Sequence, residues 1–155
     1  MIKNNKKGFT LIELLVVIAI IGLLSTLAVV SLNSARAKAR DAKRISEMKN
    51  FQSALEMYYS DKLTYPTSTL SLAAGEILGN GNAMCLDDSG LDASCAGTVY
   101  MNQINKDPQG NQTYTYTTDA NGTTYTVAFT LENLNPSLGT TRNCRFTSTS
   151  TACTY

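Results

Sequence analysis

The chain has 155 residues, a formal net charge of +1, four cysteines and no histidine. That length suits one compact domain once an extended segment is set aside. The lack of histidine removes the commonest general base and zinc ligand, and the sequence contains no nucleophile elbow or phosphate-binding glycine loop. Composition therefore argues against an enzyme and predicts neither a cofactor nor a metal.

A short basic stretch precedes a long apolar segment at the N-terminus. The 22 residues from Phe9 to Val30 carry a single charge, at Glu13. A helix of this length measures about 33 Å and can cross a bilayer. A secretory signal peptide is the alternative, but its apolar core is only about 7–15 residues long. The segment therefore predicts a retained membrane helix over residues 9–33.

Glu13 is an unusual residue for such a helix. An ionised side chain at the bilayer centre costs about 2.5–3.5 kcal/mol, so carboxylates in membrane segments usually have a partner or a function. A plain membrane anchor that happens to carry a carboxylate near its end is the alternative reading. We expect Glu13 to meet a cation.

The apolar segment opens with the run Gly8-Phe9-Thr10-Leu11-Ile12-Glu13-Leu14. This run resembles the processing site of type IV pilins and type II secretion pseudopilins. The resemblance implies that a membrane-embedded prepilin peptidase cuts between Gly8 and Phe9, removes a leader of residues 1–8 and methylates the new Phe9 amine. It also implies that Glu13 of one subunit pairs with the Phe9 amine of a neighbour during filament assembly.

The resemblance also implies partners and a cellular location for the subunit. The subunit would be held in the lipid of the inner membrane, with a cytoplasmic leader and an extracytoplasmic C-terminal part. An assembly platform in that membrane, driven by an ATPase, would add it to a homo-oligomeric helical filament. Charge alone leaves the orientation open, because both flanks of the apolar segment are basic.

Helix signals continue from residue 34 to residue 60, a stretch rich in alanine and free of glycine and proline. We expect this amphipathic half to extend the membrane helix into one helix of about 50 residues, which ends before Tyr65-Pro66. An apolar stripe with one polar exception should face the head. Its members are Ile45, Met48, Gln52, Leu55 and Tyr59.

Charge is segregated along the chain. Residues 34–49 hold six cations and two acids, whereas residues 50–155 hold four cations and nine acids. We interpret the basic stretch first as a solvated helix face, since Asp41 and Glu47 interrupt it. Basic collars could also meet the acidic heads of neighbouring subunits. The acidic head argues against nucleic acid as a partner.

Residues 61–155 should form the head, with a loop-rich connection up to Gly97. Beyond it, Thr113–Thr118 and Thr123–Leu131 are rich in β-formers, and the turn residues between them predict a hairpin. Alternation places five apolar side chains on one face of this hairpin, toward the helix. They are Tyr114, Tyr116, Tyr125, Val127 and Phe129. An aromatic strip that binds carbohydrate is the alternative.

The four cysteines fall into two locally spaced pairs. No histidine accompanies them and neither spacing resembles C-x-x-C, so metal binding is not expected. Outside the cytoplasm, sequence proximity favours disulfides between Cys85 and Cys95 and between Cys144 and Cys153 over the two other connectivities. The second bridge resembles the disulfide-closed region near the end of many type IV pilins.

Two shorter motifs and one acidic loop bear on the family. Tyr65-Pro66 and the segment 106–111 resemble the major pseudopilin of type II secretion, although Asp107-Pro108-Gln109-Gly110 is in any case expected to be a β-turn. Major pseudopilins commonly bind calcium in an acidic C-terminal loop, yet residues 133–155 contain no aspartate or glutamate. Three aspartates of the Cys85–Cys95 loop could offer oxygens, but such acids are more often solvated. They are Asp87, Asp88 and Asp92.

These observations predict an α+β subunit. Its long N-terminal α-helix, membrane-spanning in the first half and amphipathic in the second, packs on a small C-terminal antiparallel β-sheet head. The first interpretation is a structural subunit of a type IV pilus-like surface filament, favoured by the small disulfide-stapled head. The alternative is a pseudopilin of a type II protein secretion system, favoured by Tyr65-Pro66 and Asp107-Pro108. A minor pilin for adhesion or DNA uptake is a third possibility.

Overall fold

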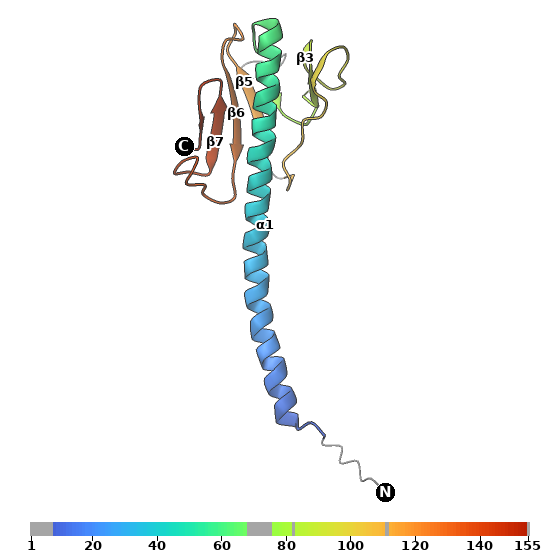
Figure 1. The fold of residues 1–155 in the computed structure, drawn as a ribbon, viewed down its shortest axis with the longest axis vertical. Coiled ribbons are helices and arrows are strands. Elements are labelled where there is room, and N and C mark those ends of the chain that lie inside the picture. The colour runs from blue at the N-terminus through green and yellow to red at the C-terminus, as the bar shows by residue number, and fades with distance from the viewer. Residues whose placement is uncertain (1–7, 68–75, 82, 111, 155) are drawn as a thin grey trace. The chain divides into compact units, whose positions relative to one another are not determined.

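The computed structural model describes residues 8–67, 76–81, 83–110 and 112–154 (Figure 1). The chain divides into two compact units, Met1–Ala37 and Lys38–Tyr155. Except for Gly8, the predicted leader lies outside the described residues.

Helix α1 spans Leu11–Lys62 without interruption, including Gly22. Its 52 residues confirm the prediction of one long helix. Leu63, the residue after the helix, adopts a positive φ of 60°, and its N–H donates to the Tyr59 carbonyl over 2.8 Å. A left-handed residue of this kind is a common helix terminator. The helix therefore ends before it reaches Tyr65-Pro66.

The larger sheet has five antiparallel strands in the order β1-β5-β6-β7-β8. Their bounds are Glu76–Ile77, Thr115–Thr118, Tyr125–Thr130, Asn143–Thr147 and Thr151–Ala152. The predicted hairpin is confirmed as β5 and β6, with Tyr116 opposite Val127. At its turn Gly122 has a φ of 65°, and its carbonyl accepts the Tyr65 N–H over 2.7 Å. Glycine suits this position because it adopts positive φ without strain.

A second antiparallel sheet has the order β3-β2-β4, and its strands β2 and β3 lie within the segment that we expected to be loop-rich. It consists of β2 (Cys85–Asp87), β3 (Gly90–Asp92) and β4 (Val99–Met101). The same segment also holds β1, so it contains short strands that we did not predict individually. These strands are only two or three residues long. Such short strands give no alternating pattern, so their pairing depends on contacts far along the chain.

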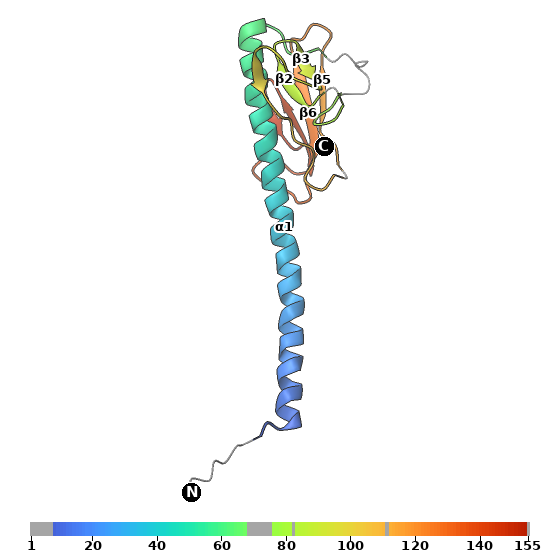
Figure 2. The same ribbon diagram turned by 90° about the vertical axis from the view of Figure 1, so that its right-hand side faces the viewer.

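The hydrophobic core of the Lys38–Tyr155 unit lies where strands β5 to β7 run alongside this part of α1 (Figure 2). Alternate residues of β6 are buried, as the pattern predicted. Tyr114, Tyr116 and Tyr125 are buried as well, and Tyr116 meets Phe51 of α1 edge-on at 5.9 Å between ring centroids. The aromatic face is therefore core, and the alternative of a carbohydrate-binding strip is wrong for these residues.

The helix stripe that enters this core differs in part from the predicted one. Met48 and Leu55 are buried, but Tyr59 is exposed and Tyr58 is buried in its place. Five of the eight buried residues of α1 form a row with steps of three and four residues, the spacing of one helix face. They are Arg44, Met48, Phe51, Leu55 and Tyr58. A polar residue, Arg44, thus continues the apolar row.

Candidate assembly site

The predicted cleavage position lies just before α1. Gly8, Phe9 and Thr10 have non-helical backbone, and the Phe9 side chain is 87% exposed. A Cβ placed on Gly8 would have no neighbour within 4 Å. Among the described residues, nothing covers the bond between Gly8 and Phe9. The geometry therefore leaves this bond open to another protein.

The first turn of α1 is closed by a capping box between Thr10 and Glu13. The backbone N–H and the hydroxyl of Thr10 donate to Glu13 Oε2 over 2.8 and 2.7 Å, and the Glu13 N–H donates to the Thr10 hydroxyl over 3.3 Å. This reciprocal pair satisfies N–H groups that a helix start leaves unpaired. It also keeps the Glu13 carboxylate beside the residue that follows Phe9.

We did not predict the role of Thr10, although the sequence contains its signal. A threonine followed three residues later by a glutamate, ahead of an apolar run, is the usual pattern of a capping box. Glu13 was interpreted only as a partner for a cation. The structure gives its carboxylate a second, local task.

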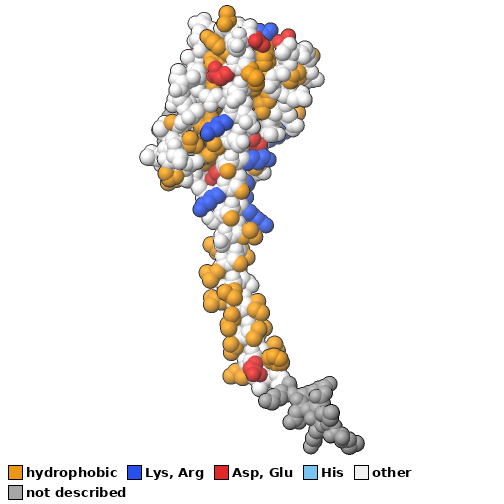
Figure 3. Space-filling model, viewed as in Figure 1, with side chains coloured by type: hydrophobic (Ala, Val, Ile, Leu, Met, Phe, Trp, Pro, Cys, Tyr) orange, Lys and Arg blue, Asp and Glu red, His pale blue; other side chains and the backbone are white. Residues whose placement is uncertain are grey.

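The N-terminal half of α1 presents apolar side chains on all sides. It is long and apolar enough to cross a membrane, and Figure 3 shows hydrophobic side chains along the visible face of this part of the helix. The hydroxyl groups of Ser25 and Thr26 are satisfied within the helix, since they donate to the carbonyls of Ile21 and Leu23 over 2.7 and 2.8 Å. Such bonds lower the cost of placing hydroxyl groups in an apolar environment.

Within the Lys38–Tyr155 unit, a cluster of charged side chains surrounds Arg44, whose side chain is 0% exposed. Its Nε donates to Asp107 Oδ2 over 2.6 Å. Its Nη1 donates to Asp41 Oδ1 over 2.9 Å and to Glu132 Oε1 over 2.7 Å. We call these four residues, together with Arg40, the Arg44 cluster. A buried guanidinium is tolerated when its donors are paired in this way.

The cluster also fastens α1 to the segment after β6. Arg40 donates from Nε and Nη2 to the two carboxylate oxygens of Glu132 over 2.7 and 2.6 Å. Asp41 accepts the backbone N–H groups of Glu132 and Asn133 over 2.8 and 2.9 Å. Charge-assisted, bidentate contacts of this kind are stronger than neutral hydrogen bonds. The helix and the chain at residues 132–133 are therefore joined by charge as well as by the apolar core.

This geometry corrects the first expectation about the basic stretch and restricts the second. It is not a solvated face at Arg44, because residue 44 lies on the same helix face as Met48 and Phe51. The acids that meet Arg40 and Arg44 belong to the same chain, so any contact between the basic stretch and a neighbouring head would use its other cations. Asp107 also begins the predicted β-turn, which is confirmed by the Gly110 N–H donating to its carbonyl over 3.0 Å.

The arginines change the acidity of their partners. Hydrogen bonds from Arg40, aided by Arg44, lower the pKa of Glu132 to about 2. Burial alone would raise the pKa of Asp107, but the hydrogen bonds from Arg44 hold it below its usual value. Both carboxyl groups are therefore ionised in the folded protein down to unusually low pH.

These shifts predict how stability depends on pH. Because the Glu132 pKa falls on folding from 4.5 to about 2, its contribution is complete above pH 4.5 and is lost as the pH falls toward 2. We expect the thermal midpoint of the full-length protein in detergent to decline across this window. Arg40→Met removes the main cause of the shift and should make the decline shallower. An unchanged pH profile in that variant would contradict the assignment.

The cysteines and the loop aspartates lie elsewhere in the same unit. Disulfides join Cys85 to Cys95 and Cys144 to Cys153. Asp87, considered above as an oxygen ligand, instead accepts the backbone N–H groups of Ser89 and Ala96, each over 2.8 Å. Among the described residues, no group of three acidic, histidine or cysteine side chains could hold a metal ion.

Comparison with known proteins places this architecture in a family. The family model described as type II secretion system (T2SS), protein G, matches residues 30–132. The chain belongs to this protein G family. A second model, the prokaryotic N-terminal methylation motif, matches residues 3–29 and so covers Gly8, Phe9 and Glu13.

The relatives that match this chain include proteins of type II secretion systems and a fimbrial protein. The type II secretion system core protein G of Aeromonas hydrophila is 34% identical over 109 residues, covering 70% of this chain and 71% of that protein. Core protein G of Escherichia coli K12 is 41% identical over 69 residues, covering 44% of this chain and about half of that protein, 48%. Fimbrial protein EcpC of Eikenella corrodens is 30% identical over 113 residues, covering 71% and 73%. No solved structure gives a significant match.

Proposed function

We propose that this family member is a structural subunit, made as a precursor, cleaved after Gly8, methylated on Phe9 and assembled into a filament through its N-terminal helix. The observation that carries the proposal is the start of α1. An open Gly8-Phe9 bond there precedes a capped helix whose first turn holds Glu13 and whose apolar side chains have no partner within the described residues. Cleavage would create an amine at Phe9, one turn from the carboxylate.

Filament assembly would provide partners both for the charges at Phe9 and Glu13 and for the exposed apolar side chains of the helix. In a stack of subunits, the Phe9 amine of one copy can pair with Glu13 of the next, which removes two uncompensated charges from an apolar interior. The exposed apolar side chains of residues 11–32 would exchange lipid contacts for contacts with other copies. Before assembly the helix would lie in the inner membrane, with the Lys38–Tyr155 unit outside the cytoplasm.

The partners follow from this proposal. They are a prepilin peptidase that also methylates, an inner-membrane platform with its ATPase, membrane lipid and further copies of the chain. We assign no catalytic residue and no nucleic-acid partner. The acids of the Arg44 cluster are used within the subunit, where they hold the fold rather than a substrate.

Of the two machines considered, the protein G match favours a pseudopilus of type II secretion. A surface pilus stays as the second candidate for a specific reason. The relative EcpC is a fimbrial protein that the chain covers over 73% of its length, and residues 133–155 lack the acidic loop expected of a calcium-binding pseudopilin.

Two measurements on the same cells test the proposal. Mass spectrometry of the N-terminal peptide should find Phe9 first, heavier by one methyl group. An intact residue 1–8 segment in the membrane-bound protein would contradict the proposed processing. Mechanical shearing should then leave a pseudopilin with the cell envelope, whereas abundant protein in the sheared fraction would assign a surface pilus.

A further inference from the structure

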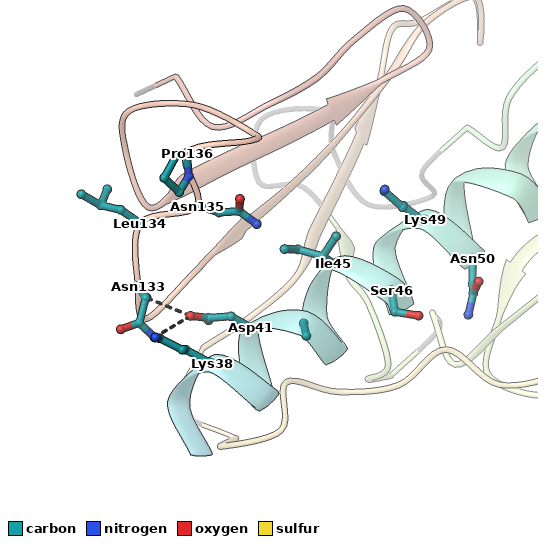
Figure 4. Close-up of a pocket in the computed structure, with 11 residues that line it drawn as sticks. Lys38, Asp41, Ile45, Ser46, Lys49, Asn50, Asn133, Leu134, Asn135 and Pro136 are labelled. Carbon is teal, nitrogen blue, oxygen red and sulfur yellow. Dashed lines mark hydrogen bonds between the residues drawn. The ribbon is translucent and has the colours of Figure 1, made fainter. Parts of the chain in front are cut away.

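An open groove of about 590 Å³ lies between α1 and the segment at residues 133–136 (Figure 4). Leu134, 60% exposed, and Pro136 line one side, and Ile45 and Ala42 of α1 line the other. Lys38 and Lys49, both exposed, also line it. We call the surface formed by these six residues the collar groove. It combines an apolar floor with two cations.

The charge of the groove is positive because its acid is already neutralised. Asp41 borders the groove, but its carboxylate binds Arg44 and the amides of Glu132 and Asn133. Neither Lys38 nor Lys49 forms an ion pair within the described residues. An acidic surface with some apolar character would complement it.

The same chain carries such a surface at the turn between β2 and β3. Asp88 is exposed in the turn and Asp92 at the end of β3, and Leu91 between them is only partly buried. The Cys85–Cys95 disulfide and the bonds that Asp87 accepts from Ser89 and Ala96 hold the turn in shape. A preformed turn loses little conformational freedom on binding. We call residues 87–92 the acidic turn.

The two surfaces are displaced along the helix. The sheet that carries the acidic turn contacts α1 near its C-terminal end, where the Tyr100 hydroxyl donates to Asp61 over 2.8 Å and the ring meets Tyr58. The groove uses helix residues 38–50. The centres are about 16 residues apart, or about 24 Å along the axis. A contact between different patches, offset in this way, propagates into an open helical assembly rather than a closed dimer.

We infer that the collar groove of one subunit receives the acidic turn of a second copy. The inference rests on the proposed filament function and adds the surfaces through which the extracytoplasmic units meet. Lys38 and Lys49 would pair with Asp88 and Asp92, while the apolar floor would cover Leu91.

A charge swap in the full-length protein tests this contact. We expect Lys49→Glu and Asp88→Lys each to lower the filament yield per total subunit to about a fifth of the wild-type amount. Their combination restores opposite charges and should return the yield to within about twofold of wild type. Lys62→Glu, the same change outside the groove, should leave it unaltered. A wild-type yield in either single variant, or a combined variant no better than the single ones, would overturn the inference.

Zero-length carbodiimide cross-linking of wild-type filaments provides an independent readout. It should give a dimer band in which Lys38 or Lys49 is joined by an amide to Asp88 or Asp92. A dimer without such a link, or a link to a different protein, would overturn the inference while leaving the filament proposal in place. A correctly processed wild-type chain that forms no filament at all would overturn the proposed function as well.

Discussion

Replacing Glu13 by glutamine is expected to leave membrane insertion intact and to lower filament assembly about a hundredfold or more. The reason is that an amine buried without its counter-charge costs several kcal/mol, and every added subunit would carry that cost. Glutamine still accepts the Thr10 N–H in the capping box, so this change removes the charge and keeps the cap. The measurement is the filament fraction per membrane-bound subunit.

Two companion variants separate the tasks of the first helical turn. Thr10→Ala removes the hydroxyl of the cap, a loss of about 1 kcal/mol in the helix start, but keeps the carboxylate. We expect it to assemble far better than Glu13→Gln. Glu13→Ala loses both functions and should resemble Glu13→Gln. If Glu13→Gln assembled at the wild-type level while Thr10→Ala failed, helix capping would replace charge pairing as the role of Glu13.

Arg44→Met is expected to lower the free energy of unfolding by about 3–5 kcal/mol, because it removes the guanidinium that Asp41, Asp107 and Glu132 share and leaves the buried Asp107 without a counter-charge. For a unit of this size, such a loss corresponds to a fall of about 15–25 °C in the thermal midpoint. Near-ultraviolet circular dichroism reports the change, because the tyrosines of the core lose their fixed packing on unfolding. The full-length protein in detergent is the sample.

The matched control for Arg44 is its neighbour in sequence. Lys43 is 60% exposed and forms only a long contact of 3.7 Å with Glu47. Lys43→Met removes the same charge from the same helix but should change stability by less than about 1 kcal/mol. Equal effects of the two substitutions would mean that net charge, and not the buried cluster, accounts for the loss.

The family assignment shifts the preference between the two filaments considered from the sequence, a surface pilus and a type II secretion pseudopilus. The small disulfide-stapled head favoured a surface pilus, whereas the Tyr65-Pro66 and Asp107-Pro108 motifs favoured a pseudopilus. The match of residues 30–132 to protein G supports the pseudopilus, as those two motifs do. The structure adds that Asp107 anchors Arg44. The motif is thus a turn whose first side chain also binds the helix.

Local patterns identified the long helix and the β5–β6 hairpin because each is coded by residues close in sequence. A run of apolar residues specifies the first half of α1, and alternation with a turn specifies the hairpin. The Thr10–Glu13 capping box is also coded by residues close in sequence, but we did not predict it. Strands β2 to β4 could not be recognised, since three residues carry no period.

By itself, the sequence determined the apolar helix, the N-terminal methylation motif and the side of the hairpin that faces the core. Only the tertiary structure decided which charged side chains between residues 40 and 49 are buried and which stay solvated. Arg44 is buried against Asp107 and Glu132, whereas Lys49 stays exposed beside the collar groove. A guanidinium and a lysine look alike in a charge pattern. Whether either is solvated depends on which acids the fold brings to it from more than sixty residues away.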